Sequence, residues 1–417
     1  MPKSSGLTRG QGRARSTLLA LGPAFVAAIA YVDPGNVAAN LTAGARYGYL
    51  LLWVLIVANA IAVLVQYQSA KIGIVTGQSL PELLGARLKD APRRAYWIQA
   101  ELVAAATDIA EVLGGAIALH LLFGIPLLVG GVIVGIASMV LLSIQSRRGQ
   151  RSFELVIIVL LAVIVVGFMT GLLFTGLDTQ EAVAGIVPRF QGTDSVLLAT
   201  SMLGATVMPH AIYLHSALAR DRHGDSATGH DPGRIAQLLR ATRWDVGGAL
   251  FVAGAVNISM LLLAASALRG IEGTDSIEGA HAAVVATLGP VVGVIFAIGL
   301  LASGLASTSV GTYAGSVIMG GLLKVQIPLL ARRVVTIIPA LIVLGIGFDP
   351  TRALVLSQVV LSFGIPFALI PLVFLASSRR VMGQFVNAPW LRVAGWAAAA
   401  LITVLNVLLI VLVVTGD

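Results

Sequence analysis

The stretch Asp33-Pro34-Gly35-Asn36 lies between two apolar runs, residues 18–32 and 37–45. A membrane-spanning helix needs about 20 apolar residues, so neither run can span alone, whereas the two together can. The stretch therefore interrupts a predicted span. Proline lacks a backbone donor and glycine loosens the helix, so the break must line a cavity or be buried in protein. An ordinary Asp-Pro-Gly turn is the alternative, and the apolar surroundings argue against it.

The composition of the chain is that of a polytopic membrane protein. Of its 417 residues, 57% are hydrophobic and 11% are charged, and the mean hydropathy is +0.94. A soluble domain carries about 25% charged residues. The chain has no cysteine, which excludes disulfides, thiolate metal ligands and cysteine nucleophiles.

Eleven hydrophobic segments predict an all-α protein with eleven transmembrane helices. They cover residues 16–42, 48–74, 94–122, 126–145, 153–175, 195–219, 242–268, 281–321, 327–347, 352–376 and 389–415. The eighth is too long for one straight helix, so we expect its end, Gly311 to Gly321, to bend or to leave the membrane. Residues 1–15 form a polar tail, and we expect one membrane domain without a separate soluble domain.

The basic residues predict the orientation of these segments. With the N-terminus in the cytoplasm, all but four of the 27 Lys and Arg residues fall on the cytoplasmic side. The exceptions are Arg46, Arg189, Arg269 and Arg352. Eleven spans then place the C-terminus, Asp417, outside. We therefore expect a multi-pass protein of the cell (inner) membrane, whose net charge of +8 faces anionic lipid and not nucleic acid.

The sixth segment contains a second interruption, Ala205-Thr206-Val207-Met208-Pro209-His210. Pro209 follows Pro34 by 175 residues, and segment six is segment one plus five. Two five-helix units that each open with an interrupted helix predict an inverted repeat, residues 16–175 and 195–376, with residues 389–415 as an additional helix. Such transporters bind their substrate between the two breaks, at the middle of the membrane. Two simple proline kinks are the alternative.

The side chains at the two breaks predict a site for a divalent transition-metal ion. Asp33 offers a carboxylate, Asn36 an amide oxygen, and unwound backbone a carbonyl at Ala205. Met208 adds a thioether sulfur, which favours Mn²⁺, Fe²⁺ or similar ions over Mg²⁺ and Ca²⁺. Methionine as a filler of the core is the alternative for Met208. So few strong donors indicate weak, reversible binding, as transport requires.

Segment three carries three acids, Glu101, Asp108 and Glu111, in an otherwise apolar helix. Spacings of seven and three residues put them near one face. Ionisable groups within a membrane are costly and indicate function, and neighbouring carboxylates are suited to exchanging protons. His210 lies just past the second break and is a further candidate for proton transfer. Static buried ion pairs are the alternative for the acids.

Two other polar residues lie in apolar segments near these positions. His215 is a candidate for titration near neutral pH or for a polar lining role. Asn257 is a candidate for an interhelical hydrogen bond or for lining a vestibule.

The two breaks together resemble the Nramp family, divalent-metal/proton symporters of the LeuT-type fold. The resemblance covers essentially the whole chain and extends to Trp97-Ile98-Gln99-Ala100-Glu101, Ala106-Thr107-Asp108-Ile109-Ala110-Glu111, Leu356-Ser357-Gln358 and Gly364-Ile365-Pro366-Phe367-Ala368. It implies a proton-coupled importer of Mn²⁺ and Fe²⁺ that works by alternating access. It also implies that Asp33, Asn36, Met208 and the Ala205 carbonyl bind the metal, joined by Gln358 in some conformations.

The resemblance further implies a proton route from Asp33 through segment three toward the cytoplasm, with basic partners in segment nine. Arg332 and Arg333 fit that role, and we expect them to pair with Asp108 and Glu111 in one order or the other. Alternatively, the two arginines only fix the orientation of the helices in the membrane, as basic residues on the cytoplasmic side do.

Other functions remain as rival predictions. A passive divalent-metal channel would need the same ligands without proton coupling. A transporter of the same fold for amino acids would find its substrate carboxylate repelled by Asp33. An intramembrane enzyme is disfavoured because the chain has no HExxH, zinc-ligand cluster or GxSxG motif. We expect no resident cofactor and no obligate protein partner, with the metal ion and the proton as co-substrates.

Overall fold

The computed structural model describes residues 22–223, 232–274 and 276–415, and the regular structure in these ranges is helical. Nine helical segments in this part of the chain are long and apolar enough to cross a membrane. They are α4 (Leu52–Thr76), α6 (Asp90–Phe123), α7 (Leu127–Arg148), α8 (Gln150–Leu172), α10 with α11 (Gly192–Thr206 and Pro209–His223), α12 (Pro232–Ala267), α14 (Pro290–Leu323), α17 (Pro350–Ala376) and α19 (Pro389–Thr415). The predicted tail, residues 1–15, and the terminal Asp417 lie outside the described residues.

Two further predicted spans are divided into shorter helices. Segment one consists of α2 (Pro23–Ile29), the 3-10 turn η1 (Ala30–Val32) and α3 (Pro34–Tyr47). Segment nine consists of α15 (Leu329–Thr336) and α16 (Ile338–Gly345). The remaining short helices connect the long ones, and they are α5 (Leu80–Arg87), α9 (Thr179–Ala184), α13 (Ile277–Leu288), α18 (Arg379–Met382) and η3 (Gly383–Phe385).

The helix is not interrupted at the end of segment eight, Gly311 to Gly321, where we predicted that it bends or leaves the membrane. The break lies at the start of that segment, where α13 ends at Gly289 with φ of 95° and Pro290 begins α14. Proline favours the first position of a helix because its missing N–H would have no helical partner there. From Pro290, α14 then continues for 34 residues through the glycines of the predicted bend.

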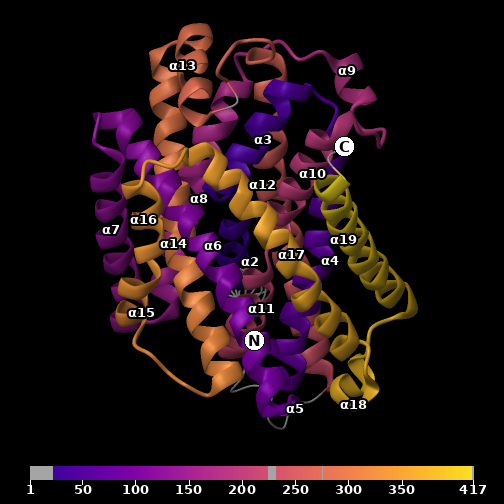
Figure 1. Ribbon diagram of the computed structural model, residues 1–417. Coiled ribbons are helices and arrows are strands. Elements are labelled where there is room, and N and C mark those ends of the chain that lie inside the picture. The colour runs from indigo at the N-terminus through magenta and orange to yellow at the C-terminus, as the bar shows by residue number, and fades with distance from the viewer. Residues whose placement is uncertain (1–21, 224–231, 275, 416–417) are drawn as a thin grey trace, which may run out of the picture.

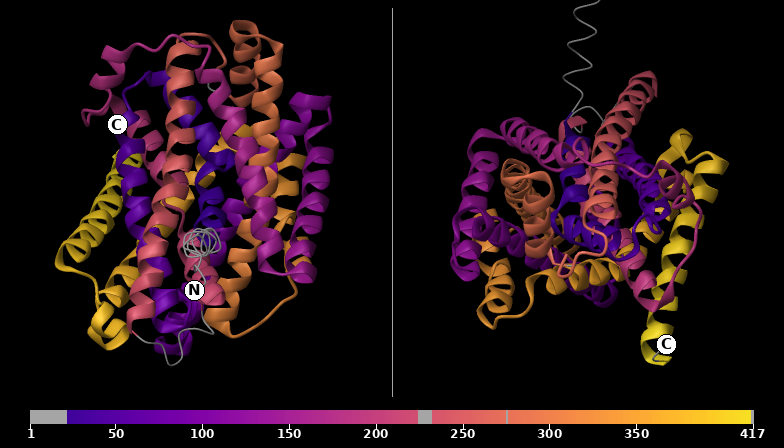
Figure 2. Two further views of the ribbon diagram at one scale, coloured as in Figure 1. Left: turned by 180° about the vertical axis from the view of Figure 1, so that it is seen from behind. Right: turned by 90° about the horizontal axis from the view of Figure 1, so that it is seen from above.

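The interrupted helices occupy the centre of the bundle (Figure 1). α2, α3, α10 and α11 are enclosed by α6, α12, α14 and α17, and α6 and α14 form the most extensive helix–helix contact. α7 lies with α15 and α16 on one flank, while α19 lies on the other, as the views in Figure 2 also show. Residues of both breaks are thereby removed from the outer surface.

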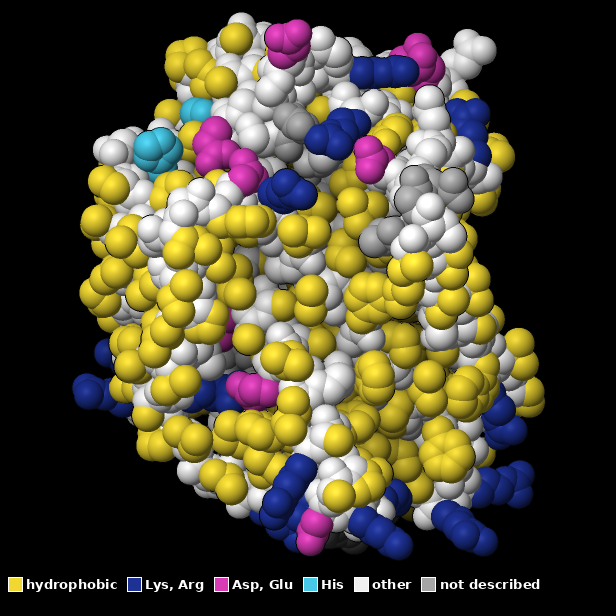
Figure 3. Space-filling view, in the orientation of Figure 1, with side chains coloured by type: hydrophobic (Ala, Val, Ile, Leu, Met, Phe, Trp, Pro, Cys, Tyr) yellow, Lys and Arg dark blue, Asp and Glu magenta, His cyan; other side chains and the backbone are white. Residues whose placement is uncertain are grey.

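The outer surface carries an apolar belt that fits a bilayer. Figure 3 shows hydrophobic side chains across the middle of the molecule and charged side chains toward its two ends, with Lys and Arg most frequent at the lower end. On α7, exposed Val129, Ile133, Ile136 and Val140 recur at helical spacing. The chain is therefore a multi-pass membrane protein in which this face of α7 meets lipid.

We expect Ile136→Arg to reduce the yield of folded protein in the membrane, whereas Ile136→Leu should not. Ile136 lies midway along α7 with 58% of its surface exposed, and an arginine at the centre of a span costs roughly 2.5–3.5 kcal/mol on insertion scales. Size-exclusion chromatography of detergent extracts measures the monodisperse fraction. Equal yields for the two variants would contradict the assignment of this face to lipid.

Candidate functional site

Asp33 ends the first half of segment one and caps the second half. Its backbone is extended, and its Oδ1 accepts hydrogen bonds from the Asn36 backbone N–H (2.7 Å) and from Asn36 Nδ2 (2.8 Å). An aspartate at the N-cap satisfies backbone donors that begin a helix and have no helical partner. The Asp33-Pro34-Gly35-Asn36 stretch is therefore a helix start inside the bundle, and the Asp33 carboxylate is fully buried at its tip.

The capping by Asp33 leaves two carbonyl groups of the preceding turn without their helical donors. Neighbouring helices replace these donors. Asn257 of α12 donates from Nδ2 to the Tyr31 carbonyl (2.6 Å), and Ser303 of α14 donates from Oγ to the Val32 carbonyl (2.6 Å). Asn257 also accepts a hydrogen bond from Asn40 of α3 (2.9 Å). The predicted polar role of Asn257 thus takes the form of interhelical hydrogen bonds that hold the break open.

The second break follows from Pro209. In a continuous helix the Ala205 carbonyl would accept a hydrogen bond from the N–H of residue 209, and proline has none. α10 accordingly ends at Thr206, and α11 begins at Pro209. The Ala205 carbonyl accepts a hydrogen bond from Asn36 Nδ2 instead (2.9 Å). The two breaks therefore face each other, and Met208 lies fully buried in the second one.

Two amide oxygens around Asp33 lack donors in the part of the chain that the structure describes. Gln358 of α17 donates from Nε2 to Asp33 Oδ2 (3.3 Å), while its own Oε1 has no partner. Asn36 Oδ1 is likewise buried and unpartnered. Buried polar atoms normally have a hydrogen-bond partner, so two such oxygens beside one carboxylate require an explanation.

Close backbone approach brings Gln358 to this position. A Cβ at Gly204 of α10 would overlap the Gln358 carbonyl oxygen, and a Cβ at Gly35 would overlap the Gln358 amide. Glycine at both positions lets α17 pack tightly against the two breaks. Hydrogen bonds thus link four of the five predicted metal-site residues, which are Asp33, Asn36, Ala205 and Gln358. The fifth, Met208, is fully buried in the second break, three residues after Ala205.

The five residues of this site are inaccessible from either end of the molecule. A separate cavity of about 520 Å³ lies at the upper end, between α3, α10 and α17, and residues lining it include Thr42, Asp194, Asp349 and Leu356. Within the described ranges no three His, Asp or Glu side chains form a cluster suited to tight metal binding. A single carboxylate with neutral donors suits an ion that must also be released.

The acids of α6 extend from this site toward the lower end of the bundle. Glu111 is fully buried, close enough to Asp33 and Asp108 to interact with their charges, and neither of its oxygens accepts a hydrogen bond from the described residues. Asp108 has 4% of its side chain exposed, and Glu101 has 28% exposed. The seven residues between Glu101 and Asp108 correspond to about 10 Å along the helix. The three acids that spacing places near one face of α6 therefore lead from the buried Glu111, next to Asp33, to the partly exposed Glu101.

The predicted pairing of these acids with α15 is correct for Asp108 and wrong for Glu111. Arg333 lies 3.1 Å from Asp108 and donates from Nε to Ser138 of α7 (2.7 Å). Arg332 pairs with Glu101 at 2.5 Å. Consecutive residues of a helix point about 100° apart, so the two arginines of α15 reach acids two turns apart on α6. Both arginine side chains are buried, which anchoring at a membrane surface does not require.

Two of the three histidines of α11, His210 and His215, are buried but have different surroundings. His210 Nδ1 lies 3.4 Å from Thr107 Oγ1 of α6, and its Nε2 has no partner among the described residues. His215 Nδ1 lies 2.8 Å from Gln66 Oε1, and Gln66 in turn donates to the Tyr31 hydroxyl (2.5 Å). His210 thus lies beside the acids of α6, whereas His215 belongs to a hydrogen-bond chain between η1, α4 and α11.

A polar cluster that the sequence reasoning did not identify closes the lower end of α2. Asp245 of α12 accepts a hydrogen bond from the Ala24 backbone N–H (3.3 Å). Arg222 of α11 pairs with Glu154 of α8 at 2.5 Å, beside Gly22. Asp245 and Glu154 are ionisable residues in apolar segments, and this was the signal available in the sequence.

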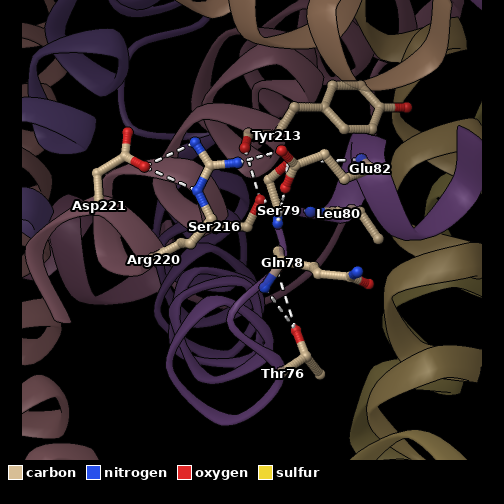
Figure 4. Close-up of polar contacts among 9 residues, drawn as sticks. All are labelled: Thr76, Gln78, Ser79, Leu80, Glu82, Tyr213, Ser216, Arg220 and Asp221. Carbon is tan, nitrogen blue, oxygen red and sulfur yellow. Dashed lines mark hydrogen bonds and ion pairs between the residues drawn. The ribbon is translucent and has the colours of Figure 1, made fainter. Parts of the chain in front are cut away.

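A second set of contacts at this end ties α11 to α5. Figure 4 shows the Arg220 guanidinium between Asp221 and Glu82, with which it forms ion pairs. Ser216 accepts a hydrogen bond from the Leu80 backbone N–H (2.8 Å) and donates to the Tyr213 carbonyl (2.7 Å). These contacts therefore hold α11, the second half of segment six, against α5, which connects α4 to α6.

Comparison with known proteins agrees with this geometry. The profile of the family described as Natural resistance-associated macrophage protein-like, Nramp, matches residues 24–412. The chain belongs to the Nramp family. It is 60% identical to the divalent metal cation transporter MntH of Mycobacterium tuberculosis over 397 residues, which cover 95% of this chain and 92% of that protein. The resemblance predicted from the two breaks is confirmed.

Solved structures show that the Nramp bundle of this chain is of the LeuT type. The crystal structure of the Eremococcus coleocola manganese transporter, in complex with an aromatic bis-isothiourea substituted compound, aligns with a TM-score of 0.85 and 31% identity. The alignment covers 98% of this chain and 88% of that one. MhsT in complex with L-phenylalanine aligns with a TM-score of 0.64 over 93% of this chain and 97% of its own, at 14% identity. The second likeness concerns the fold alone.

We expect Asn257→Ala to destabilise the fold more than Ser259→Ala. Loss of the Asn257 amide leaves the Tyr31 carbonyl and Asn40 Nδ2 without their partners, and each unsatisfied buried group costs about 1–3 kcal/mol. Ser259 is also buried in α12, but its hydroxyl bonds only the Ala255 carbonyl of its own helix. Thermal unfolding in detergent compares the variants. Equal melting temperatures would contradict the role of Asn257 at the break.

The environment of Glu82, at the lower end, leads us to expect that the protein loses stability in acid. Burial opposes its ionisation, but the Ser79 backbone N–H and Arg220 outweigh this and lower the pKa of Glu82 below its ordinary value of 4.5. A carboxylate with a lowered pKa stabilises the fold above its unfolded pKa, and this stability is lost as the pH falls through the lowered value. The melting temperature of Glu82→Gln should therefore lie below that of the native chain by a constant amount from about pH 8 to about pH 5.5, and the difference should shrink at lower pH.

The matched control is Glu181→Gln, which removes the ion pair to Arg269 at the upper end. Both partners of that pair are 53% exposed, so its contribution is small at any pH. A difference for Glu82→Gln that does not change below pH 4.5 would show that its carboxylate is not ionised in the folded protein.

Proposed function

We propose that this chain imports divalent transition-metal ions, Mn²⁺ and also Fe²⁺, together with protons by alternating access. The observation that carries the proposal is the pair of donor-free amide oxygens, Asn36 Oδ1 and Gln358 Oε1, beside the buried Asp33 carboxylate. Membership of a family whose relatives are named divalent metal cation transporter and manganese transporter supports it.

In the absence of a cation, the amide N–H groups around Asp33 donate to the oxygens that a cation would contact. Asn36 Nδ2 donates to both Asp33 Oδ1 and the Ala205 carbonyl, and Gln358 Nε2 donates to Asp33 Oδ2. When a dication arrives, rotation of each amide by about 180° exchanges its nitrogen for its oxygen. Asp33, Asn36, the Ala205 carbonyl and Gln358 then all present oxygen to the ion. The site switches from hydrogen bonding to coordination without movement of the helices.

Met208 supplies the selectivity in this proposal. Oxygen donors alone would accept the abundant hard ions Ca²⁺ and Mg²⁺, whereas a thioether sulfur adds binding energy chiefly for softer ions. Its complete burial in the second break, next to the freed Ala205 carbonyl, supports this role.

The acids of α6 provide the route for the proton. A dication favours the ionised form of Asp33, so its proton leaves when the metal binds. Glu111, which forms no ion pair with the described residues, accepts that proton and passes it to Asp108 and then to Glu101. Arg333 and Arg332 hold Asp108 and Glu101 in place, and His210 lies beside the start of the route.

Alternating access uses the two interrupted helices as moving parts. The contacts of α2 with Asp245 and of α11 with α5 close the lower end in this structure, and the cavity of about 520 Å³ marks the approach from the upper end. Release of metal to the lower side requires these contacts to separate. We propose eleven spans in two inverted five-helix repeats, residues 16–175 and 195–376, followed by residues 389–415.

The lower end is the cytoplasmic side in this proposal. Helices α5 and α18 lie there (Figure 1), and they carry Arg87, Arg379 and Arg380. The N-terminus is then cytoplasmic, the C-terminus is extracytoplasmic, and the protein resides in the cell (inner) membrane. The metal ion and the proton are its substrates, and neither a resident cofactor nor an obligate protein partner is part of the mechanism.

Uptake of Mn²⁺ into proteoliposomes that contain a pH-sensitive dye tests the proposal. We expect Mn²⁺ entry to acidify the lumen, and an inward proton gradient to accelerate entry. Mn²⁺ uptake without a proton signal and without saturation would favour a passive channel.

Asp33→Asn should abolish Mn²⁺ uptake, since it removes the only carboxylate of the proposed site and the group that releases the proton when the metal binds. The variant keeps an oxygen at the N-cap of α3, so folding is expected to persist and is checked by thermal unfolding. Full uptake by the folded variant would remove Asp33 from the site.

Met208→Ala should retain part of the Mn²⁺ uptake and gain competition by Ca²⁺ or Mg²⁺. The loss of sulfur leaves only oxygen donors, which do not discriminate against hard ions. Met202→Ala is the matched control, since Met202 is also fully buried in α10 but precedes the break. Unchanged competition in Met208→Ala would contradict the role of the thioether.

A further inference from the structure

A second cavity lies at the lower end of the bundle, away from the metal site. It has a volume of about 670 Å³ and is bounded by α4, α12 and the segment from η3 to the start of α19. Pockets of this size commonly hold small organic ligands. In Figure 2, left, α12 (salmon) and α19 (yellow) lie on either side of α4, and both contact α4. The cavity is thus an interhelical groove on the outside of the bundle.

Two positive charges line this groove without an acidic partner. Lys71 of α4 has only 5% of its surface exposed, and its ammonium donates to Asn387 Oδ1 (2.9 Å), which is a neutral group. The Arg243 guanidinium of α12 lies 5.5 Å from the centre of the Tyr67 ring. Neither residue takes part in an ion pair with the described residues, and Arg243 is close enough to repel the charge of Lys71.

The position of Lys71 is held firmly. Asn387, which accepts from Lys71, donates from Nδ2 to Gln68 Oε1 (2.6 Å) and from its backbone N–H to the Ala376 carbonyl (3.0 Å). Burying an ammonium beside a second cation is unfavourable unless an anion compensates both. The two cations therefore form a built site for which the described residues supply no compensating anion.

The other walls of the groove are apolar and lie at the membrane boundary. Leu64, Val246 and Leu391 are among the lining residues. Trp390, which lines the groove, is 69% exposed, and Trp244, next to Arg243, is 78% exposed. Exposed tryptophans are enriched where the hydrocarbon region meets the headgroups. The cations thus lie at headgroup depth, and the apolar walls extend from them toward the hydrocarbon.

We propose that this groove binds an anionic phospholipid, with the phosphate between Lys71 and Arg243 and an acyl chain against the apolar wall. Basic pockets between transmembrane helices are a known means of binding anionic headgroups. The apolar wall favours a lipid over free phosphate, which would gain nothing from it. The bound lipid would connect α4, α12 and α19, and this goes beyond the proposed metal transport because none of the metal-site residues lines the groove.

Native mass spectrometry of the full chain in mild detergent tests the proposal, with dioleoyl phosphatidylglycerol or dioleoyl phosphatidylcholine added. We expect the native chain to retain one phosphatidylglycerol in preference to phosphatidylcholine. Lys71→Gln with Arg243→Gln should weaken the retention of phosphatidylglycerol roughly tenfold or more, since each cation contributes to headgroup binding. Arg243→Gln alone should give a smaller loss, and its exposed position makes it safe for folding.

The matched control is Arg379→Gln with Arg380→Gln, which removes two exposed charges at the same end outside the groove. It should retain phosphatidylglycerol as the native chain does. Ala60→Trp, which fills the apolar wall without changing a charge, should also lose the lipid.

Equal retention of both lipids by the native chain, or an equal loss in the control variant, would overturn the proposal. Displacement of phosphatidylglycerol by millimolar inorganic phosphate, together with unchanged retention in Ala60→Trp, would show a simple anion site and would also overturn it.

Discussion

The missing N–H groups of Pro34 and Pro209 are the constraint on which the rest of the structure depends. Within a bilayer, each carbonyl group that a proline deprives of its donor must find another inside the protein. At the second break Asn36 is the donor that replaces the N–H missing from Pro209. At the first break the cap formed by Asp33 leaves the Tyr31 and Val32 carbonyls without helical donors, and Asn257 and Ser303 donate to them. The breaks are therefore stable parts of the fold, and Asn36 joins the Asp33 carboxylate of one to the Ala205 carbonyl of the other.

The same constraint links the proposed metal site to the acids of α6. Because Asp33 serves as an N-cap, its carboxylate is fixed by the backbone of α3, and α17 approaches it closely enough for Gln358 to reach it. Glu111 lies within electrostatic reach on the other side. A change of charge at Asp33 is thus felt by the next acid of α6, which is what coupling between metal and proton requires.

Much of this arrangement could be predicted from the sequence, because proline, glycine and ionisable residues give strong signals in an apolar background. The two breaks, the site residues and the stripe of acids depend on spacing along single helices, which the sequence contains. The pairing of Arg332 with Glu101 could not be predicted, because it depends on where the short helix α15 lies against α6. Ser303 gave no signal, since serines are common among the small residues of α14. The break at Gly289 was missed because apolar residues continue on both sides of it.

The central claim is that the two breaks form one metal site. Crystals grown with Mn²⁺ and measured at the manganese absorption edge test it most directly, since anomalous scattering locates the ion without assumptions about its ligands. The account predicts one strong peak in contact with Asp33, Asn36, the Ala205 carbonyl and Met208. A strongest peak elsewhere, for example between Asp194 and Asp349 of the upper cavity, with none at Asp33, would contradict it.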